Sequence, residues 1–252
     1  METGYYFQSV GRLNNLRKHD RGGRIIKCLP REKLYKGREW VDRKIVVLGA
    51  GGHSRSVCDI LLQDARNHVV GLVDAQAVKG FWGIPVLGGD EVLPGLRETG
   101  EAEYTFVAIG DNLLRRKLIE QVVCLGYKMV NAISSHAILS PHADLGQGVA
   151  VMPGAIVGAN AVIDTGAIIN TNASVDHDVQ VGAHCHVAPG AVICGSVSLG
   201  DGVFIGAGAR VIDGLNIGSH TTIGAGAAVI HDLPSDCVAV GVPARIIKRK
   251  GE

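Results

Sequence analysis

The chain carries three histidines within one ten-residue stretch: His177, His184 and His186. An imidazole gains and loses a proton near neutral pH, so each is a candidate general base or metal ligand. His177 is followed directly by Asp178, and a carboxylate that reaches an imidazole fixes its tautomer and stabilises the imidazolium. This pair favours acid–base chemistry, provided that the short Asp side chain reaches the ring.

The elements that position these histidines belong to a repeat. Residues 138–233 divide into sixteen consecutive hexads, and the second residue of every hexad is aliphatic. The fifth residue is Gly, Asn, Asp or His in fifteen of the sixteen, with Ser196 as the exception, and those residue types tolerate positive φ. Each hexad is therefore predicted to be a short strand followed by a turn.

Strands of this kind bury their aliphatic residues only when copies stack. The pattern predicts a parallel β-helix with three hexads, or eighteen residues, in each coil. It does not determine the hand of the helix. The narrow interior explains the few aromatic residues, and the turns in every coil explain the 35 glycines.

The position within the hexad separates the three histidines. His184 occupies the fifth, turn position, which favours a structural role, whereas His177 occupies the fourth, where no other hexad except the last has His. One coil leads from His177 to Gly195, about 4.8 Å away if the coils stack as strands do, so its N–H is a candidate oxyanion donor. His186 lies half a coil away, so it can share a site with His177 only across a subunit boundary, which predicts a cyclic trimer.

A different pattern precedes the repeat. Alternating apolar strands and amphipathic helices begin at Lys44 and predict a parallel βαβ sheet. The predicted strands are Lys44–Leu48, Val69–Val73, Tyr104–Ile109 and Met129–Ile133. The predicted helices run through residues 57–61 and over Leu113–Leu125.

Glycines follow the first of these strands, at the N-terminus of the first helix. Backbone N–H groups at Gly51 and Gly52 suit a phosphate. Ser54 replaces the third glycine of the dinucleotide fingerprint, so a mononucleotide fits better than NAD. His53 is predicted to donate to a diphosphate or sugar, and Asp74, after the next strand, to bind a ribose hydroxyl.

The segment Gly110-Asp111-Asn112 ends a later strand at the same edge of the predicted sheet. Open α/β folds bind ligands at this edge, so Asn112 and Arg115 are expected to face the ligand. A plain turn followed by a solvated arginine explains the same residues nearly as well.

Several segments together resemble the sialic-acid and bacillosamine-pathway sugar acetyltransferases. They are Gly51-Gly52-His53, Gly110-Asp111-Asn112, the run from Asn170 to Asp178, His186, and Gly241-Val242-Pro243-Ala244. The likeness covers about residues 43–247. That family joins a nucleotide-sugar-binding α/β domain to a trimeric left-handed β-helix, so the resemblance implies this fold and hand.

The resemblance also implies residue roles. His177 corresponds to the base, and Asp178 to its acidic neighbour, which is often Glu in the family. The acetyl-CoA site is expected to include His186, Gly195, Gly206, Ala207 and Gly224. The nucleotide-sugar site is expected to include Gly51, Gly52, His53, Asp74, Asn112 and Asn170. Ala75 stands where the family often has a second acid, which leaves the nucleotide base open.

The sequence therefore predicts an acetyl-CoA-dependent N-acetyltransferase acting on the 4-amino group of a nucleotide-linked 4-amino-4,6-dideoxyhexose, without a metal. O-acetylation of a sialic-acid-like sugar is the alternative within the same class. A metal-dependent hydratase using the three histidines and a non-catalytic nucleotide-sugar-binding protein are alternatives of other classes.

The predicted organisation has four parts. Residues 1–42 form an irregular basic leader, 43–135 the nucleotide-sugar-binding domain, 136–235 the β-helix and 236–252 a C-terminal tail. Lys plus Arg number 25 and Asp plus Glu 24, so no overall field favours nucleic acid or a membrane. Six cysteines without a CxxC pair and the lack of a long apolar run indicate a cytoplasmic protein with free thiols.

Overall fold

The computed structural model describes residues 18–19, 25–26 and 42–249. The chain divides into two units, which meet at residues 41 and 42. Within the first, strands β1 (Lys18–His19) and β2 (Ile25–Ile26) pair antiparallel. The rest of the predicted leader, up to residue 41, lies outside the described residues.

The second unit begins with a five-stranded parallel sheet in the order β5-β4-β3-β6-β7. Its strands are β3 (Arg43–Leu48), β4 (Asn67–Val73), β5 (Val86–Gly88), β6 (Tyr104–Val107) and β7 (Lys128–Met129). Its helices are α2 (Gly52–Leu61), the 3₁₀ helix η1 (Asp90–Val92), α3 (Leu93–Glu98) and α4 (Asn112–Cys124). The sequence pattern did not predict β5, η1 or α3.

The strand order creates a switch point in this sheet. The first strand in the chain, β3, lies at the centre, with β4 and β5 on one side and β6 and β7 on the other. Sheets of this kind bind ligands in the crevice beyond the carboxyl ends of the strands where the order reverses. The loops after β3 and β6 therefore carry the predicted glycine turn and the Gly110-Asp111-Asn112 segment to one edge.

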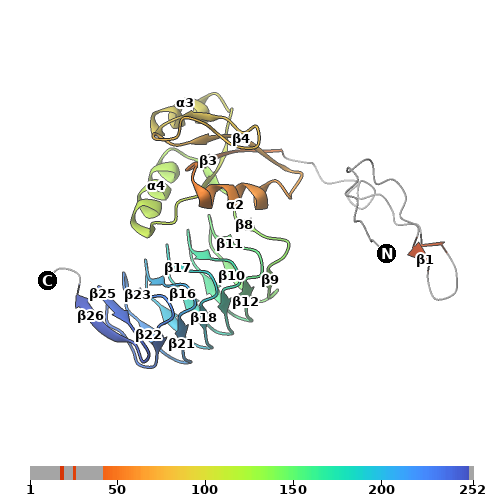
Figure 1. Cartoon of the computed structure of the whole chain (residues 1–252). Coiled ribbons are helices and arrows are strands. Elements are labelled where there is room, and N and C mark those ends of the chain that lie inside the picture. Colours follow the sequence, from red (N-terminus) through yellow and green to blue (C-terminus); the bar gives the residue numbers. More distant parts are fainter. Residues whose placement is uncertain (1–17, 20–24, 27–41, 250–252) are drawn as a thin grey trace, which may run out of the picture. The chain divides into compact units, whose positions relative to one another are not determined.

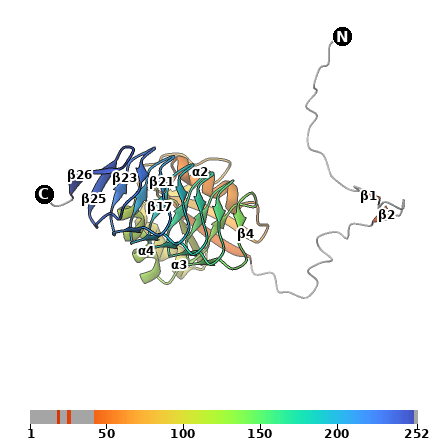
Figure 2. The same cartoon turned by 90° about the horizontal axis from the view of Figure 1, so that it is seen from below.

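The repeat forms a three-sided parallel β-helix, and Figures 1 and 2 show its coils stacked in sequence order. The β17 face contains β8 (Ala132–Ile133), β11 (Ala150–Val151), β14 (Ile168–Ile169), β17 (His186–Val187), β20 (Phe204–Ile205), β23 (Thr222–Ile223), β25 (Cys237–Val240) and β26 (Arg245–Arg249). The β15 face contains β9 (Ile138–Leu139), β12 (Ile156–Val157), β15 (Ser174–Val175), β18 (Val192–Ile193), β21 (Arg210–Val211) and β24 (Ala228–Val229). The β16 face contains β10 (Asp144–Leu145), β13 (Val162–Ile163), β16 (Gln180–Val181), β19 (Ser198–Leu199) and β22 (Asn216–Ile217).

The eighteen-residue register is confirmed from β8 to β24, for example where Ser174 pairs with Val192, and the offset shortens to sixteen residues where Thr222 pairs with Val238. The turn positions also follow the prediction. Every fifth hexad residue from Gly148 to Gly226 has positive φ, including Ser196, whose residue type was the exception. Stacking of the aliphatic interior thus holds the turn conformation even where the side chain is not one that favours it.

The predicted strand Met129–Ile133 is wrong as a single element. The segment splits into β7, which pairs with β6 in the α/β sheet, and β8, which pairs with β11 in the coils. The register explains the division, since Ala132 lies eighteen residues before its partner Ala150.

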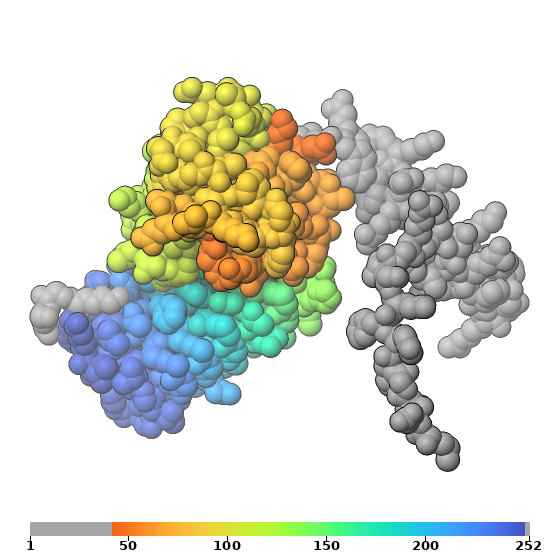
Figure 3. Space-filling view, turned by 45° about the horizontal axis from the view of Figure 1, so that its top comes forward, coloured from red at the N-terminus to blue at the C-terminus, as the bar shows by residue number. Residues whose placement is uncertain are grey.

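Apolar packing joins the α/β domain to the coils. Helix α2 contributes Val57 and Ile60 to a buried cluster that also contains Ala150, Met152 and Ile168 of the coils. Figure 3 shows the two parts in direct contact. A separate core, made of the inward aliphatic residues, fills the β-helix.

Candidate active site

His177 lies at the exposed corner between the β15 and β16 faces. Its Nδ1 lies 2.8 Å from Oδ2 of Asp178, so the shorter acid does reach the ring. Asp178 has a φ of 58° in the turn position, and its Oδ1 accepts a hydrogen bond from Asn160 Nδ2 at 3.1 Å. The turn and a neighbouring coil therefore hold the carboxylate against the imidazole.

This contact sets the protonation of the pair. The hydrogen bond to Asp178, aided by the charge of Asp176, raises the pKa of His177. The same bond lowers the pKa of the Asp178 carboxyl. When His177 is neutral, Nδ1–H donates to the carboxylate and Nε2 is the proton acceptor, which is the arrangement a general base requires.

Gly195 lies directly beneath the His177 ring, one coil further on. A Cβ at this position would stand 2.6 Å from Cε1 and 2.7 Å from Nε2 of His177, so the close approach requires glycine. The backbone N–H of Ser196 donates to the carbonyl of His177. Within the described residues the N–H of Gly195 has no acceptor, which leaves it available to a ligand.

His186 lies on the β17 face in the opposite environment. Its side chain is buried, its Nε2 lies 3.0 Å from Asn170 Nδ2 and its Nδ1 3.3 Å from the Gly110 carbonyl. Burial, and then the charge of Arg115, lowers its pKa to about 4. A neutral ring must donate from Nδ1 to the carbonyl and accept at Nε2 from the amide, so both partners specify one tautomer.

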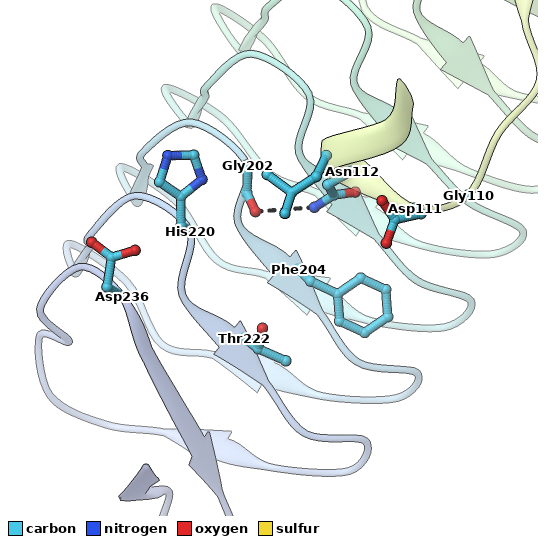
Figure 4. A pocket seen from close by; sticks show the side chains of 9 residues that line it. Gly110, Asp111, Asn112, Gly202, Phe204, His220, Thr222 and Asp236 are labelled. Carbon is cyan, nitrogen blue, oxygen red and sulfur yellow. Dashed lines mark hydrogen bonds between the residues drawn. The ribbon is translucent and has the colours of Figure 1, made fainter. Parts of the chain in front are cut away.

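A cavity of about 480 Å³ opens beside His186, between the start of α4 and the β17 face (Figure 4). It is lined by Gly110, Asp111, Asn112, Leu113, Gly202, Phe204, His220, Thr222 and Asp236. Phe204 packs edge-to-face on His186 at 5.2 Å between ring centroids. Phe204 and Thr222 were not predicted from the sequence as site residues. They lie one and two coils after His186 on the same face, so the eighteen-residue period could have identified them.

Asn112 lies at this cavity, as predicted, but its amide already has partners. Nδ2 donates to the Gly202 carbonyl at 3.0 Å. Asp111 caps α4 by accepting from the N–H of Leu114, which explains where the helix begins. The loop before α4 is therefore fixed to the coils without a ligand.

The glycine turn lies at the carboxyl end of β3. Helix α2 begins at Gly52 with no side-chain cap at Gly51, so its first N–H groups face outward, as an anion site requires. Burial, and then Arg115, lowers the pKa of His53 to about 4, and its buried Nε2 has no partner within the described residues.

Asp74 stabilises the backbone next to the glycine turn. Its carboxylate accepts from the N–H groups of Ala50, Gln76 and Ala77. These bonds lower its pKa, chiefly the one from Gln76. The ribose contact predicted for Asp74 stays a prediction beside this structural role.

Arg115 does not face the ligand, so that expectation is wrong. Its side chain is 1% exposed and its guanidinium donates to backbone carbonyls and to Asn112. The reason is its place on α4, on the side that packs against the coils. His184 takes the predicted turn conformation with a φ of 58°.

The remaining predicted residues lie at the third corner, between the β17 and β15 faces. Gly206 and Ala207 follow β20, and Gly224 follows β23. Ala207 is exposed. The structure therefore places the predicted acetyl-CoA residues on more than one side of the prism in a single protomer.

Two further findings concern the described residues as a whole. No three His, Cys, Asp or Glu side chains among them lie close enough together to hold a metal ion. None of the helices found there has the length and apolar character needed to cross a membrane. Residues 42–249 also include five cysteines, all free thiols.

Comparison with known proteins adds independent findings. The model of the PglD N-terminal domain matches residues 44–122. PerB from Caulobacter crescentus, solved with CoA and GDP-perosamine, is 46% identical over 81% of this chain and 97% of that chain, with a TM-score of 0.78. Two variants of that perosamine N-acetyltransferase, each with one histidine replaced, match with similar scores.

Two other solved structures are similar over most of the chain. The acetyltransferase domain of PglB from Neisseria gonorrhoeae FA1090, solved with acetyl coenzyme A, is 35% identical over 82% of this chain and 100% of that chain, with a TM-score of 0.78. WeeI from Acinetobacter baumannii AYE is 25% identical over 81% and 100%, with a TM-score of 0.74. The expected fold class, an α/β domain followed by a left-handed parallel β-helix, is confirmed.

Proposed function

We propose the reaction of this chain from one established premise: the chain belongs to the PglD-like sugar acetyltransferases. It is an acyltransferase, a sugar N-acetyltransferase whose acyl donor is acetyl-CoA. The proposed acceptor is the 4-amino group of a nucleotide-linked 4-amino-4,6-dideoxyhexose. The GDP-linked sugar is the first candidate, because the relative that is 46% identical over 97% of its length was solved with GDP-perosamine and CoA. That likeness is the observation that carries the proposal.

His177 is proposed as the general base. The acceptor nitrogen attacks the thioester carbonyl carbon, and Nε2 of His177 takes the proton that the nitrogen loses. Asp178 holds Nδ1 at 2.8 Å and stabilises the imidazolium. Direct attack requires no covalent enzyme intermediate.

Gly195 is proposed to stabilise the transition state. The thioester oxygen gains negative charge as the C–N bond forms, and the Gly195 N–H, which has no acceptor within the described residues, is proposed to donate to it. Collapse of the tetrahedral intermediate breaks the C–S bond and releases the CoA thiolate. The glycine also leaves the space that the His177 ring fills.

His186 and the cavity beside it are proposed to hold the acetyl-CoA end of the site. A neutral, buried imidazole of fixed tautomer suits binding better than proton transfer. The uncapped start of α2, at Gly51 and Gly52, is proposed to hold the nucleotide sugar, with His53 beside it.

We propose a homotrimer with sites between subunits. The outer side of the β15 face exposes Ile138 and Ile156, which are 65% and 41% exposed, and this face adjoins the His177 corner. An exposed apolar patch of this kind marks an interface. Ile156→Glu should reduce the molar mass measured by light scattering, whereas Gln180→Glu on the β16 face should not. A wild-type monomer would contradict the trimer.

The test of the function measures thiol release from acetyl-CoA against GDP-, UDP- and dTDP-linked 4-amino sugars, with the product identified by mass spectrometry and NMR. We expect an amide at C4 and the highest kcat/KM with the GDP-linked sugar. An ester product would favour O-acetylation instead, and binding without thiol release would favour a non-catalytic protein. A metal-dependent hydratase would hold zinc between subunits through three imidazoles, and zinc found in protein purified without added metal would favour it.

A further inference from the structure

Arg115 is a buried cation that the proposed mechanism does not use. Its side chain is 1% exposed, and no Asp or Glu within the described residues forms a salt bridge with it. Burying a charge without a counter-ion is costly unless hydrogen bonds replace its hydration. The hydrogen bonds of this guanidinium therefore indicate what it does.

The guanidinium joins two parts of the chain. In the loop before α4 it donates from Nη1 to the carbonyls of Ile109 and Gly110, both at 3.0 Å, and at the first residue of α4 it donates from Nη2 to Asn112 Oδ1 at 2.8 Å. In the coils its donors are Nε and Nη2. They reach the carbonyls of Gly166 at 2.7 Å, His184 at 2.7 Å and Cys185 at 3.2 Å.

Both parts lead directly to the candidate site. The Gly110 carbonyl that accepts from Arg115 also accepts from Nδ1 of His186. Cys185, whose carbonyl Arg115 contacts, precedes His186 in the chain, and Asn112 lines the cavity. A single planar side chain thus fixes the loop, the neighbouring backbone of His186 and the acceptor of its ring proton.

We propose that Arg115 is a positioning residue that holds the 109–112 loop against the 184–186 segment in the register needed to bind both substrates. The inference rests on the proposed function, which assigns acetyl-CoA to His186 and the nucleotide sugar to the edge of the sheet. Arg115 acts through these groups and touches neither substrate.

The kinetic test compares Arg115→Met and Arg115→Lys with Arg116→Met. Arg116 is the matched control because it is the next residue in the same turn of α4 but pairs with Glu120 at the surface. Arg115→Met should raise the KM of acetyl-CoA and of the nucleotide sugar at least about tenfold, since small misplacements of binding groups are costly. Arg115→Lys should give a smaller rise, and the control no change.

A purely structural role would give a different result. Unfolding of part of the enzyme lowers Vmax in proportion to the lost active fraction and leaves both KM values unchanged. That outcome would overturn the proposal. If Arg115→Met does not fold, Arg115→Lys, which keeps the charge, decides the matter.

A second readout does not depend on activity. Histidine labelled with ¹³C at Cε1 gives one NMR signal per ring, and His186→Phe identifies the signal of His186. We expect this signal to shift in Arg115→Lys and to keep its position in Arg116→Met. An unchanged signal would overturn the positioning role, whereas failure of the wild-type enzyme to acetylate GDP-perosamine would overturn only the proposed function.

Discussion

The two candidate histidines lie nine residues apart, yet the coil gives them opposite properties. His177 projects from a corner, where water surrounds it and Asp178 raises its pKa. His186 lies on a face covered by the α/β domain, and burial lowers its pKa to about 4. A regular β-helix therefore supplies a proton acceptor and a neutral binding group from the same residue type, by placing one at a turn and one under a neighbouring domain.

The difference also bears on assembly. In one protomer the two rings lie on different sides of the prism, so a site that uses both requires a second subunit. The following predictions test whether His177, at the corner, transfers the proton and whether His186, on the β17 face, serves in binding.

Replacing the corner histidine should have the largest effect. His177→Ala removes the base and should lower kcat by about 10²–10⁴-fold, the usual contribution of general-base catalysis. Acetyl-CoA affinity, measured by calorimetry, should stay within about twofold because the face is untouched. An unchanged kcat would remove His177 from the mechanism.

Gly195→Ala should have the second largest effect on kcat. The added Cβ would stand 2.6 Å from the His177 ring, and the displaced base should lower kcat by about 10²-fold. Gly182→Ala is the control. Its added Cβ is crowded to the same degree, at 2.7 Å from Asp201 and Gly200, but it does not contact His177. Equal losses of kcat per folded enzyme in both variants would show that crowding alone matters.

Asp178→Asn should change the pH dependence. The active base is neutral His177, so the rate falls as the pH drops through its pKa, which Asp178 raises. In the variant the acid limb of the pH–rate profile should move to lower pH, and the maximal kcat should fall about tenfold because the tautomer is no longer fixed. Asn tolerates the positive φ at this turn. A limb that stays in place would separate Asp178 from the base.

Phe204→Leu should give the smallest effect, confined to binding. It removes the edge-to-face contact with His186, which is worth about 1 kcal/mol, so the KM of acetyl-CoA should rise about fivefold with kcat unchanged. Titration of acetyl-CoA at saturating nucleotide sugar checks this. A fall in kcat without a change in KM would place Phe204 in the chemical step instead.

The sequence predicted the surroundings of His177 at its corner better than the surroundings of His186 on the β17 face. The hexad period alone gives the register that puts His177 over Gly195, because three hexads make a coil of eighteen residues. Whether Asp178 reached the ring depended on side-chain torsions that no period specifies. The same register would have identified Phe204, had it been continued from His186.

The face depends on contacts between distant segments, which a linear pattern does not contain. Arg115 reads as a solvated or ligand-facing helix residue until α4 packs on the coils and covers it. Asp74 is predicted to contact the ligand, and the structure adds that its carboxylate accepts hydrogen bonds from three backbone N–H groups. Both sets of contacts, those of Arg115 and those of Asp74, become visible only when the chain is folded.

The most direct test of the account mixes a subunit that lacks the base with a subunit that lacks the binding histidine. We would assemble trimers at random from equal amounts of His177→Ala and His186→Phe chains and compare the kcat/KM for acetyl-CoA of the whole population with that of each parent. If the base and the binding face come from different subunits, some sites recover both intact groups, and about a quarter of wild-type activity should return. Mixed assemblies no more active than their parents would contradict a site built between subunits.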